Sequence, residues 1–238
     1  MQSPTRFNRR EAFSLIAVSA AGGVLMSQSA FAQEAGAADT TSLISGADVC
    51  VITPETTAGP FYFDPGLERA DITEGRPGVA TRVRLQVVDA ACQAVAGARI
   101  DIWHCDASGL YSGYPGHPGG LSTVGETFMR GTQFADANGV VEFATVYPGW
   151  YPGRTAHIHF IVFLAEATIL TGQIFFPDDV STSIYQSQAP YNERGAERDT
   201  LNADDGIARR AGSASLAAVE TASGGYLATM IIGMNAAG

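Results

Sequence analysis

Two histidines one residue apart, His157 and His159, lie within an apolar segment of the chain. In an extended strand, residues i and i+2 point to the same side, so both imidazoles would face one side while Ile158 and Phe160 face the other. Because the segment is apolar on both sides, the strand is expected to be buried. A buried imidazole needs a polar partner, either a metal ion or hydrogen-bonding groups of the core. The pair alone leaves both interpretations open.

Further residues with chemical potential lie near the pair. Tyr151 precedes His157 by six residues and Arg154 precedes it by three, and a second tyrosine-bearing loop lies upstream. An iron site of two histidines and one carboxylate needs an acid close by, which this stretch does not offer. All 14 basic residues are arginine, and the absence of lysine excludes Schiff-base and pyridoxal chemistry. The sequence also has no G-x-S-x-G motif and no glycine-rich phosphate loop that opens a helix.

Three motifs together carry a specific resemblance. They are residues 102–112 (IWHCDASGLYS), 147–151 (YPGWY) and 154–160 (RTAHIHF), and Gln173 follows His159 by fourteen residues. In this order and spacing they resemble the intradiol ring-cleavage dioxygenases, and most of all secreted single-domain members similar to the protocatechuate 3,4-dioxygenase β chain and to catechol 1,2-dioxygenase. The likeness covers roughly residues 50 to 235.

The resemblance implies one mononuclear Fe(III) ion per chain. Carried over by position, its ligands would be Tyr111, Tyr151, His157 and His159. Arg154, Gln173 and Tyr151 would be catalytic, and Pro60 and Tyr62 would border the substrate. The choice of ligands is physically reasonable, because a bound cation stabilises a phenolate that would otherwise form only near pH ~10. Two phenolates and a hydroxide would balance the three charges of ferric iron.

The implied reaction is cleavage of a catechol-like ring between its two hydroxyl-bearing carbons, with O2 as co-substrate and a cis,cis-muconate-type product. The implied partners are therefore a small aromatic diol and O2. One alternative is a non-catalytic secreted β-sandwich binding module with a degenerate metal site, and another is a zinc or copper hydrolase built on the His-x-His pair. The remaining histidines are assigned other tasks: His104 is expected to serve strand packing, and His117 is expected to be a loop residue.

The elements that must position these residues are short strands between turn signals. Strands are expected at 82–88, 98–104, 140–145, 169–176 and 225–233, in addition to the strand that carries the histidines. Residues 105–133 form a long connection with six glycines between Gly109 and Gly125, a length typical of functional loops. No helical periodicity is evident beyond a turn near 196–202. The pattern predicts an all-β fold, a two-sheet β-sandwich with long active-site loops and little helix.

The N-terminus has the features of an export signal. Arg9 and Arg10 precede an apolar run and an A-x-A site at 30–32, so residues 1–32 are expected to be a signal peptide, of the twin-arginine type. Residues 33–48 would be a flexible leader and 49–238 the catalytic domain. Removing the signal leaves 11 basic and 23 acidic residues, a net charge of −12, which predicts no binding to nucleic acid or to an anionic membrane. The expected location is periplasmic or secreted.

Three cysteines in an exported chain allow one disulfide. We expect Cys50 to pair with Cys92, because Cys105 lies beside the loop assigned to chemistry. Whether the protein forms a homo-oligomer is left open by the sequence.

Overall fold

The computed structural model describes residues 43–44, 50–194 and 198–235. The predicted signal peptide, and all of the predicted leader except two residues, lie outside this part. None of the helices among the described residues is long and apolar enough to cross a membrane.

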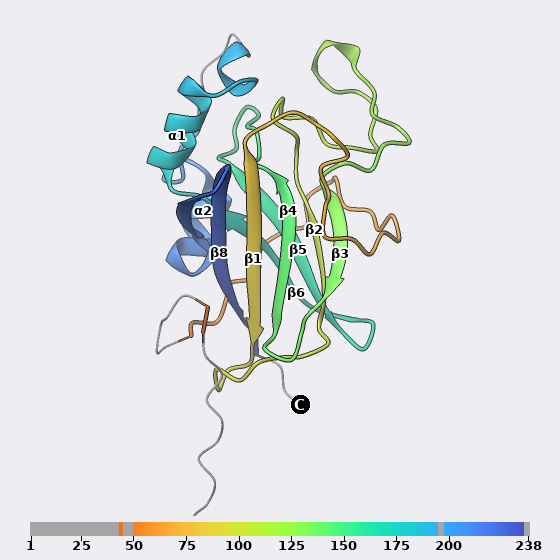
Figure 1. Cartoon of the computed structure of the whole chain (residues 1–238), viewed down its shortest axis with the longest axis vertical. Coiled ribbons are helices and arrows are strands. Elements are labelled where there is room, and N and C mark those ends of the chain that lie inside the picture. The colour runs from red at the N-terminus through yellow and green to blue at the C-terminus, as the bar shows by residue number, and fades with distance from the viewer. Residues whose placement is uncertain (1–42, 45–49, 195–197, 236–238) are drawn as a thin grey trace, which may run out of the picture. The chain divides into compact units, whose positions relative to one another are not determined.

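Two four-stranded sheets pack face to face (Figure 1). The first has the order β4-β1-β8-β7, with β4 at Val140–Val146, β1 at Ala80–Val88, β8 at Gly225–Gly233 and β7 at Ala218–Ala222. The second has the order β3-β2-β5-β6, with β3 at Arg130–Phe134, β2 at Arg99–Trp103, β5 at His157–Leu164 and β6 at Ala167–Phe175. All neighbours are antiparallel except β1 and β8. The predicted β-sandwich is confirmed.

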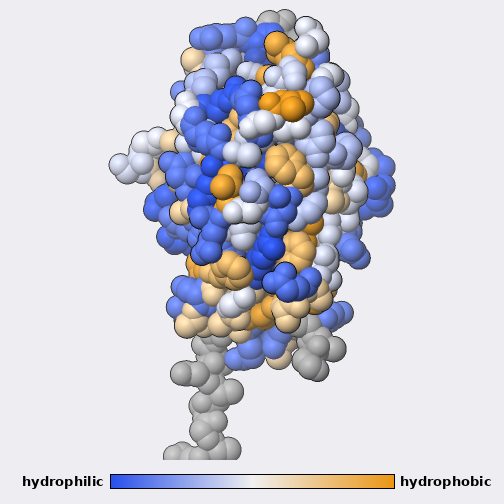
Figure 2. Space-filling model, turned by 90° about the vertical axis from the view of Figure 1, so that its right-hand side faces the viewer, coloured by the Kyte–Doolittle hydropathy of each residue, from blue (hydrophilic) through white to orange (hydrophobic). Residues whose placement is uncertain are grey.

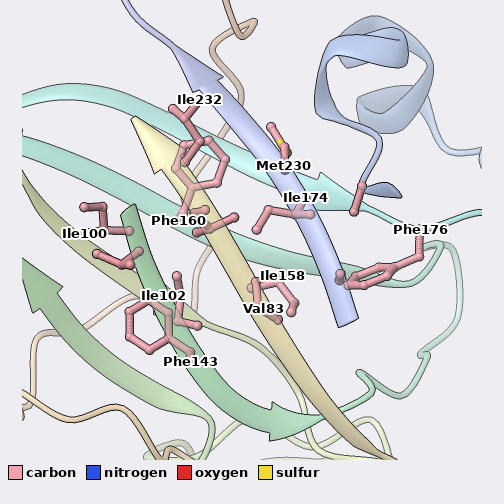
Figure 3. Packing of buried hydrophobic residues seen from close by; sticks show 14 of the residues in the cluster. Val83, Ile100, Ile102, Phe143, Ile158, Phe160, Ile174, Phe176, Met230 and Ile232 are labelled. Atoms are coloured by element: carbon pink, nitrogen blue, oxygen red, sulfur yellow. The ribbon is translucent and has the colours of Figure 1, made fainter. Parts of the chain in front are cut away.

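The main core lies between the sheets, where each contributes its inward-facing alternate residues. Val83 of β1 and Phe143 of β4 meet Ile158 and Phe160 of β5, and all four are fully buried (Figure 3). Each such side chain contributes roughly 1.5–3 kcal/mol through removal from water. This packing fixes the plane of the second sheet, on whose other face the two histidines lie.

Strand β5 is apolar on both faces, as expected. Ile158, Phe160 and Val162 belong to the main core, whereas Ile161 and Phe163 belong to a separate cluster on the opposite face. The period of two residues places the histidines on that opposite face.

Several elements differ from the sequence prediction. Strand β3 begins inside the segment assigned to the 105–133 connection, and β7 was not expected. Helix α1, Asp178–Ser187, was also missed because it buries only Ser181, Ile184 and Tyr185 and consists mostly of weak helix formers. The helical turn predicted near 196–202 is wrong for residues 198–202, which form no helix; helix α2 spans Gly206–Ala211 instead. Both helices lie on the side of the molecule away from β3 (Figure 1).

Short 3₁₀ turns occupy Pro118–Gly120, Tyr191–Glu193 and Gly212–Ser215. The first lies within the long loop between β2 and β3, and the second follows α1. These turns therefore belong to connections and not to the sheets that carry the core.

The disulfide between Cys50 and Cys92 is present, and Cys105 is free and buried. Of the predicted leader, the structure describes only residues 43 and 44. Leu43 is buried, and the backbone N–H of Ile44 donates to Gln86 Oε1 at 2.9 Å, so this short stretch is attached to the domain. Figure 2 shows one face of the molecule, on which apolar residues appear as small groups among polar ones.

Candidate active site

Strand β5 presents His157 and His159 side by side on the face away from the main core. It lies between β2 and β6, where Trp103 and Gln173 are the residues in register with His159. Both imidazoles are only 2% exposed. Burial lowers the pKa of His157 to about 3 and the pKa of His159 well below its ordinary value, with nearby positive and imidazole groups acting in the same direction. Both rings are therefore neutral near pH 7, the form that can bind a metal.

The hydrogen bonds of His157 determine which nitrogen faces the site. Its Nδ1 lies 2.7 Å from the carbonyl oxygen of Thr155, which can only accept, so Nδ1 carries the hydrogen. The lone pair of Nε2 then faces three groups: Tyr151 Oη at 3.0 Å, Tyr111 Oη at 3.3 Å and Arg154 Nη1 at 3.4 Å. A backbone partner of this kind is the usual way in which a metal-binding histidine is oriented.

Tyr111 comes from the long loop after β2 and is held rigidly. Its side chain is 1% exposed and stacks on Phe61, with ring centroids 4.4 Å apart. Its backbone carbonyl accepts hydrogen bonds from His117 Nε2 at 2.8 Å and from Thr123 Oγ1 at 2.6 Å. His117 is thus a loop residue, as expected, but a buried one that fixes the position of Tyr111.

Tyr151 reaches the same point from a tight turn that runs to Arg154, whose backbone N–H donates to Tyr151 O at 3.2 Å. Its side chain is partly exposed, and its Oη lies 3.5 Å from that of Tyr111. The structure therefore brings together the hydroxyls of both predicted tyrosines and one predicted histidine.

His159 completes the group. Its ring stacks on Trp103 with centroids 4.9 Å apart and an interplanar angle of 8°, and it meets the His157 ring edge to face at 4.8 Å. Its buried Nδ1 makes no hydrogen bond of normal geometry with any described residue. The Thr57 backbone interacts with this ring, but outside normal hydrogen-bond geometry, which leaves the buried imidazole without a strong protein partner.

The donor set fits a cation better than it fits hydrogen bonding alone. Nε2 of His157 has one lone pair but faces two hydroxyls and a guanidinium. Atoms that share one metal ion at roughly 2 Å each lie about 3 Å from one another, which matches the separations of 3.0–3.5 Å. Among the described residues, no three His, Cys, Asp or Glu side chains come together, so the oxygens would have to be phenolic.

Burial alone opposes ionisation of the tyrosines. It raises the pKa of Tyr111 well above the ordinary value and the pKa of Tyr151 to about 12, and for Tyr111 the neighbouring Tyr151 adds to the effect. A bound cation reverses this balance by stabilising the anionic form. The two phenolates would therefore depend on the metal, and metal binding would release their protons.

Arg154 stands beside the four candidate ligands and is oriented from two sides. Its Nη2 donates to Gln173 Oε1 at 2.5 Å, and Gln173 Nε2 in turn donates to the Thr57 carbonyl at 2.9 Å. Its Nε donates to Asp205 Oδ2 at 2.7 Å. Burial raises the pKa of Asp205, but hydrogen bonding and attraction from Arg154 outweigh it, so the net pKa lies below the ordinary value. Asp205 was not identified from the sequence, because fifty-one residues separate it from Arg154.

The segment that holds Pro60 and Tyr62 lies beside the site, but the side chains of these two residues point to different surroundings. Pro60 is exposed, and Tyr62 donates to Asp101 Oδ2 at 2.9 Å and packs against Trp103. Between them, Phe61 stacks on Tyr111 and lines the cavity described below. The contact of Pro60 and Tyr62 with substrate stays a prediction. The alternation of side chains along this segment is the sequence signal that could have identified Phe61.

A cavity of about 470 Å³ has both predicted tyrosines, Tyr111 and Tyr151, among its lining residues. Its walls come from residues 108–111, 116–118 and 121 of the long loop, with Phe61, Tyr151, Pro152 and Arg194. Arg194 was not identified from the sequence, since nothing in the polar segment around it points to the site. Cavities of this size are typical of sites for small molecules.

His104 lies outside this arrangement. It is buried, with Nδ1 2.8 Å from the Cys105 carbonyl oxygen and Nε2 2.8 Å from Thr145 Oγ1, which confirms its expected packing role. Free Cys105 donates to the Gly149 carbonyl at 3.5 Å, and burial raises its pKa to about 12. Such a thiol is not reactive near neutral pH.

Comparison with known proteins identifies the family to which the chain belongs. Residues 59–204 match a family model described as "Dioxygenase". An intradiol ring-cleavage dioxygenase from Tetranychus urticae has a solved structure that is 33% identical, with a TM-score of 0.73 over 79% of this chain and 97% of that chain. The chain belongs to the intradiol ring-cleavage dioxygenase family.

Two further relatives have either a lower TM-score or a match over less of their own length. The dioxygenase domain of a dioxygenase carbohydrate-binding protein fusion from Streptomyces sp. SirexAA-E is 28% identical, with a TM-score of 0.58 over 79% of this chain and 100% of that chain. Hydroxyquinol 1,2-dioxygenase of Corynebacterium glutamicum is 30% identical over 57% of this chain and 50% of its own length. The chain thus spans about half the length of the curated relatives it matches.

Proposed function

We propose that this member of the intradiol dioxygenase family is an Fe(III)-dependent enzyme that opens the ring of catechol-like aromatics between the two hydroxyl-bearing carbons. The observation that carries the proposal is the convergence of Tyr111 Oη, Tyr151 Oη and His157 Nε2 within 3.0–3.5 Å, with His159 beside them. Similarity to relatives named for hydroxyquinol and catechol supports the substrate class.

Four side chains would hold the metal: two neutral imidazoles from one rigid strand and two phenolates from loops. Bound ferric iron would supply a hard Lewis acid that holds the diol oxygens and draws electron density from the ring. The phenolates would favour the ferric state because they would bring negative charge to a buried position. O2 and the aromatic diol are the co-substrates, and a cis,cis-muconate-type acid is the product.

The surrounding residues have separate tasks. Both tyrosines line the cavity, but Tyr151 is partly exposed whereas Tyr111 is buried, so the Tyr151 oxygen can accept a proton from an incoming diol. Arg154 places a permanent positive charge beside His157, where it would stabilise negative charge that develops on the substrate. Gln173 fixes the direction of that guanidinium through its Oε1.

Export of the protein belongs to the same proposal. A twin-arginine signal at residues 1–32 would carry the folded chain across the membrane after its metal had been inserted. Fractionation of cells that express the full-length chain tests this, because the mature protein should be found outside the cytoplasm and should lack these residues.

The central experiment combines metal analysis, visible absorption and oxygen uptake on the full chain matured in its host. We expect about one iron per chain, a phenolate-to-iron charge-transfer band, and O2 consumption with catechol. Tyr151→Phe should shift the band and lower kcat by about 10²–10⁴-fold, the usual range for a lost acid–base group. Tyr226→Phe is the matched control, because Tyr226 lies on β8 of the other sheet.

Zinc or no metal in the purified protein would contradict the proposal, as would an unchanged spectrum in Tyr151→Phe. A colourless protein with normal folding would instead favour the binding module with a degenerate site.

A further inference from the structure

The long loop between β2 and β3, residues 104–129, carries Tyr111 and is tied back on itself by a buried arginine. Arg130, the first residue of β3, donates from Nε to Ser112 Oγ and from Nη2 to the Ser112 carbonyl, both at 2.8 Å. Ser112 Oγ in turn donates to the Phe128 carbonyl at 2.7 Å. Because Ser112 directly follows Tyr111, the end of the loop is bonded to the residue next to the candidate ligand.

An aromatic ring holds the same part of the loop from another side. The guanidinium carbon of Arg130 lies 4.1 Å from the centre of the Phe63 ring, close enough for a cation–π interaction. Phe63 also packs directly against Gly113, where an added Cβ would overlap the ring. Gly113 has a φ of +86°, a conformation that glycine adopts without steric cost. The two residues after Tyr111 are therefore fixed by the arginine and by the ring on which it lies.

The charge of Arg130 is unfavourable for the stability of the fold. The residue is 1% exposed, and its Nη1 makes no hydrogen bond with any described residue. None of the ion pairs in the described part of the chain includes it. Burial lowers the pKa of Arg130 to about 10, which leaves the side chain charged near neutral pH. Since an apolar side chain of similar size often stabilises a buried position equally well or better, stability alone does not explain an arginine here.

The location of Arg130 beside the candidate site does explain it. No hydrogen bond of Arg130 goes to the side chain of a candidate ligand among the described residues, so its effect must pass through Ser112. The fork of its guanidinium binds the hydroxyl and the carbonyl of one residue together, a geometry that a lysine or an apolar side chain cannot reproduce. Ser112 is fully buried, so water cannot replace these bonds.

We propose that Arg130 is a positioning residue for the candidate metal ligand Tyr111, which it holds at the site through Ser112 before any metal is bound. The inference rests on the proposed function, since it adds a supporting residue to the same metal site. The other three candidate ligands come from residues 151–159, outside this loop. Loss of Arg130 should therefore weaken one of the four ligands and leave the fold in place.

A purely structural role for Arg130 is the competing explanation. Its loss would then affect metal binding only as much as any other substitution that destabilises the fold. Val87→Ala is the matched control, because Val87 is fully buried in the main core near the end of β1, on the sheet that carries none of the candidate ligands. Truncation of a core residue lowers stability through lost packing, without a change in the loop of Tyr111.

The first experiment measures hydrogen–deuterium exchange of the metal-free full chain by mass spectrometry. Arg130→Met should raise the exchange rate in peptides from residues 105–127, with unchanged exchange in β1 and β8. The N–H of Gly113, which donates to the Thr123 carbonyl at 2.8 Å, lies in the part of the loop that should respond. Val87→Ala should raise exchange in β1 and β8 instead. Loop exchange at the wild-type rate in Arg130→Met would overturn the proposal.

The second experiment measures the affinity for ferric iron by competition with a chelator. Arg130→Met and Ser112→Ala should each weaken iron binding by about 10- to 100-fold, the usual effect of losing a residue that orients a metal ligand. The double variant should bind iron little more weakly than Arg130→Met, because both residues act along one path. Arg130→Lys should recover part of the affinity, since an ammonium group can reach one of the two Ser112 acceptors. The phenolate-to-iron band should shift in Arg130→Met and keep its wild-type position in Val87→Ala.

The outcomes separate the two explanations. Equal losses of iron affinity in Arg130→Met and Val87→Ala, or additive losses in the double variant, would overturn the positioning role. If Arg130→Met does not fold, Arg130→Lys and Ser112→Ala provide the same comparison with smaller changes. If the wild type binds no iron, the proposed function fails, and the exchange measurement still decides whether Arg130 holds the loop of Tyr111.

Discussion

Asp205 connects the candidate site to helix α2, and replacing it with asparagine tests whether this connection supports the fold. The side chain is buried, and each of its oxygens has two partners. Oδ2 accepts from Arg154 Nε at 2.7 Å and from the Thr155 N–H at 3.1 Å. Oδ1 accepts from the N–H groups of Ile207 and Ala208 at 2.7 and 3.2 Å, which caps the first turn of α2.

Asparagine keeps the shape of the side chain but has only one acceptor oxygen. Whichever way the amide turns, its NH2 group faces two donors. If the cap is kept, the charged hydrogen bond to Arg154, of about 1.5–3 kcal/mol, is lost, and a buried N–H at Thr155 is left unpaired at about 1–3 kcal/mol. Because the Arg154 side chain is 18% exposed, hydrogen bonds from its guanidinium to water offset part of this loss of free energy. We therefore expect Asp205→Asn to lower the free energy of unfolding by about 3 kcal/mol.

Urea unfolding followed by tryptophan fluorescence measures the change, with Asp204→Asn as the matched control. Asp204 is the preceding residue, is exposed, and has no hydrogen bond or ion pair from its side chain among the described residues. The control removes the same charge from nearly the same place and should change stability by less than about 0.5 kcal/mol. A loss below about 1 kcal/mol in Asp205→Asn, or a loss equal to that of the control, would refute the reasoning.

Two further predictions concern the core and the pH dependence of stability. Gly172 of β6 lies opposite Phe160, and a Cβ at this position would overlap the buried phenylalanine ring. Gly172→Ala should therefore lower the free energy of unfolding by about 1–3 kcal/mol, measured as a lower Tm. An unchanged Tm would contradict this packing. Burial lowers the pKa of His104 to about 4, with Arg130 nearby acting in the same direction, so the unfolded chain binds the proton more readily. The contribution of neutral His104 to the free energy of unfolding should be fully present above about pH 6.5 and should fall by about 3 kcal/mol as the pH drops to about 4. The difference in the free energy of unfolding between the wild type and His104→Gln should therefore narrow over this range. A difference that stays constant would contradict the prediction.

Much of the sheet structure could be predicted because local pattern and tertiary packing agree. Alternation along β1 and turn residues around β4 define these strands without knowledge of their partners. Strand β7 is short and largely exposed, so it has no apolar pattern to reveal it. Helix α1 depends on three buried side chains and on tertiary packing that its own sequence does not indicate. Its start could have been found, since two acids follow Pro177 in the first turn.

The residues of the candidate site likewise fall into those that the sequence could predict and those that it could not. The face of the strand on which His157 and His159 lie follows from a period of two residues, so it could be predicted from the sequence. The resemblance to a family identified Tyr111 and Tyr151, whose approach depends on two loops that no local rule positions. Asp205 could not be identified from the sequence, because its partner is distant in the chain and carboxylates are common on surfaces.

Strand β5 and the two tyrosine loops also indicate which tyrosine would be the better suited to leave the proposed metal. Core packing of Ile158 fixes the strand, and both histidines share its backbone, so the candidate nitrogen ligands cannot move without disturbing the core. The candidate oxygen ligands come from loops that are held to different degrees. Tyr111 is buried against Phe61 and held by a hydrogen bond to its carbonyl, whereas Tyr151 is partly exposed on a short turn. If the proposed metal is bound, displacement of Tyr151 would therefore require the smallest rearrangement of the four candidate ligands.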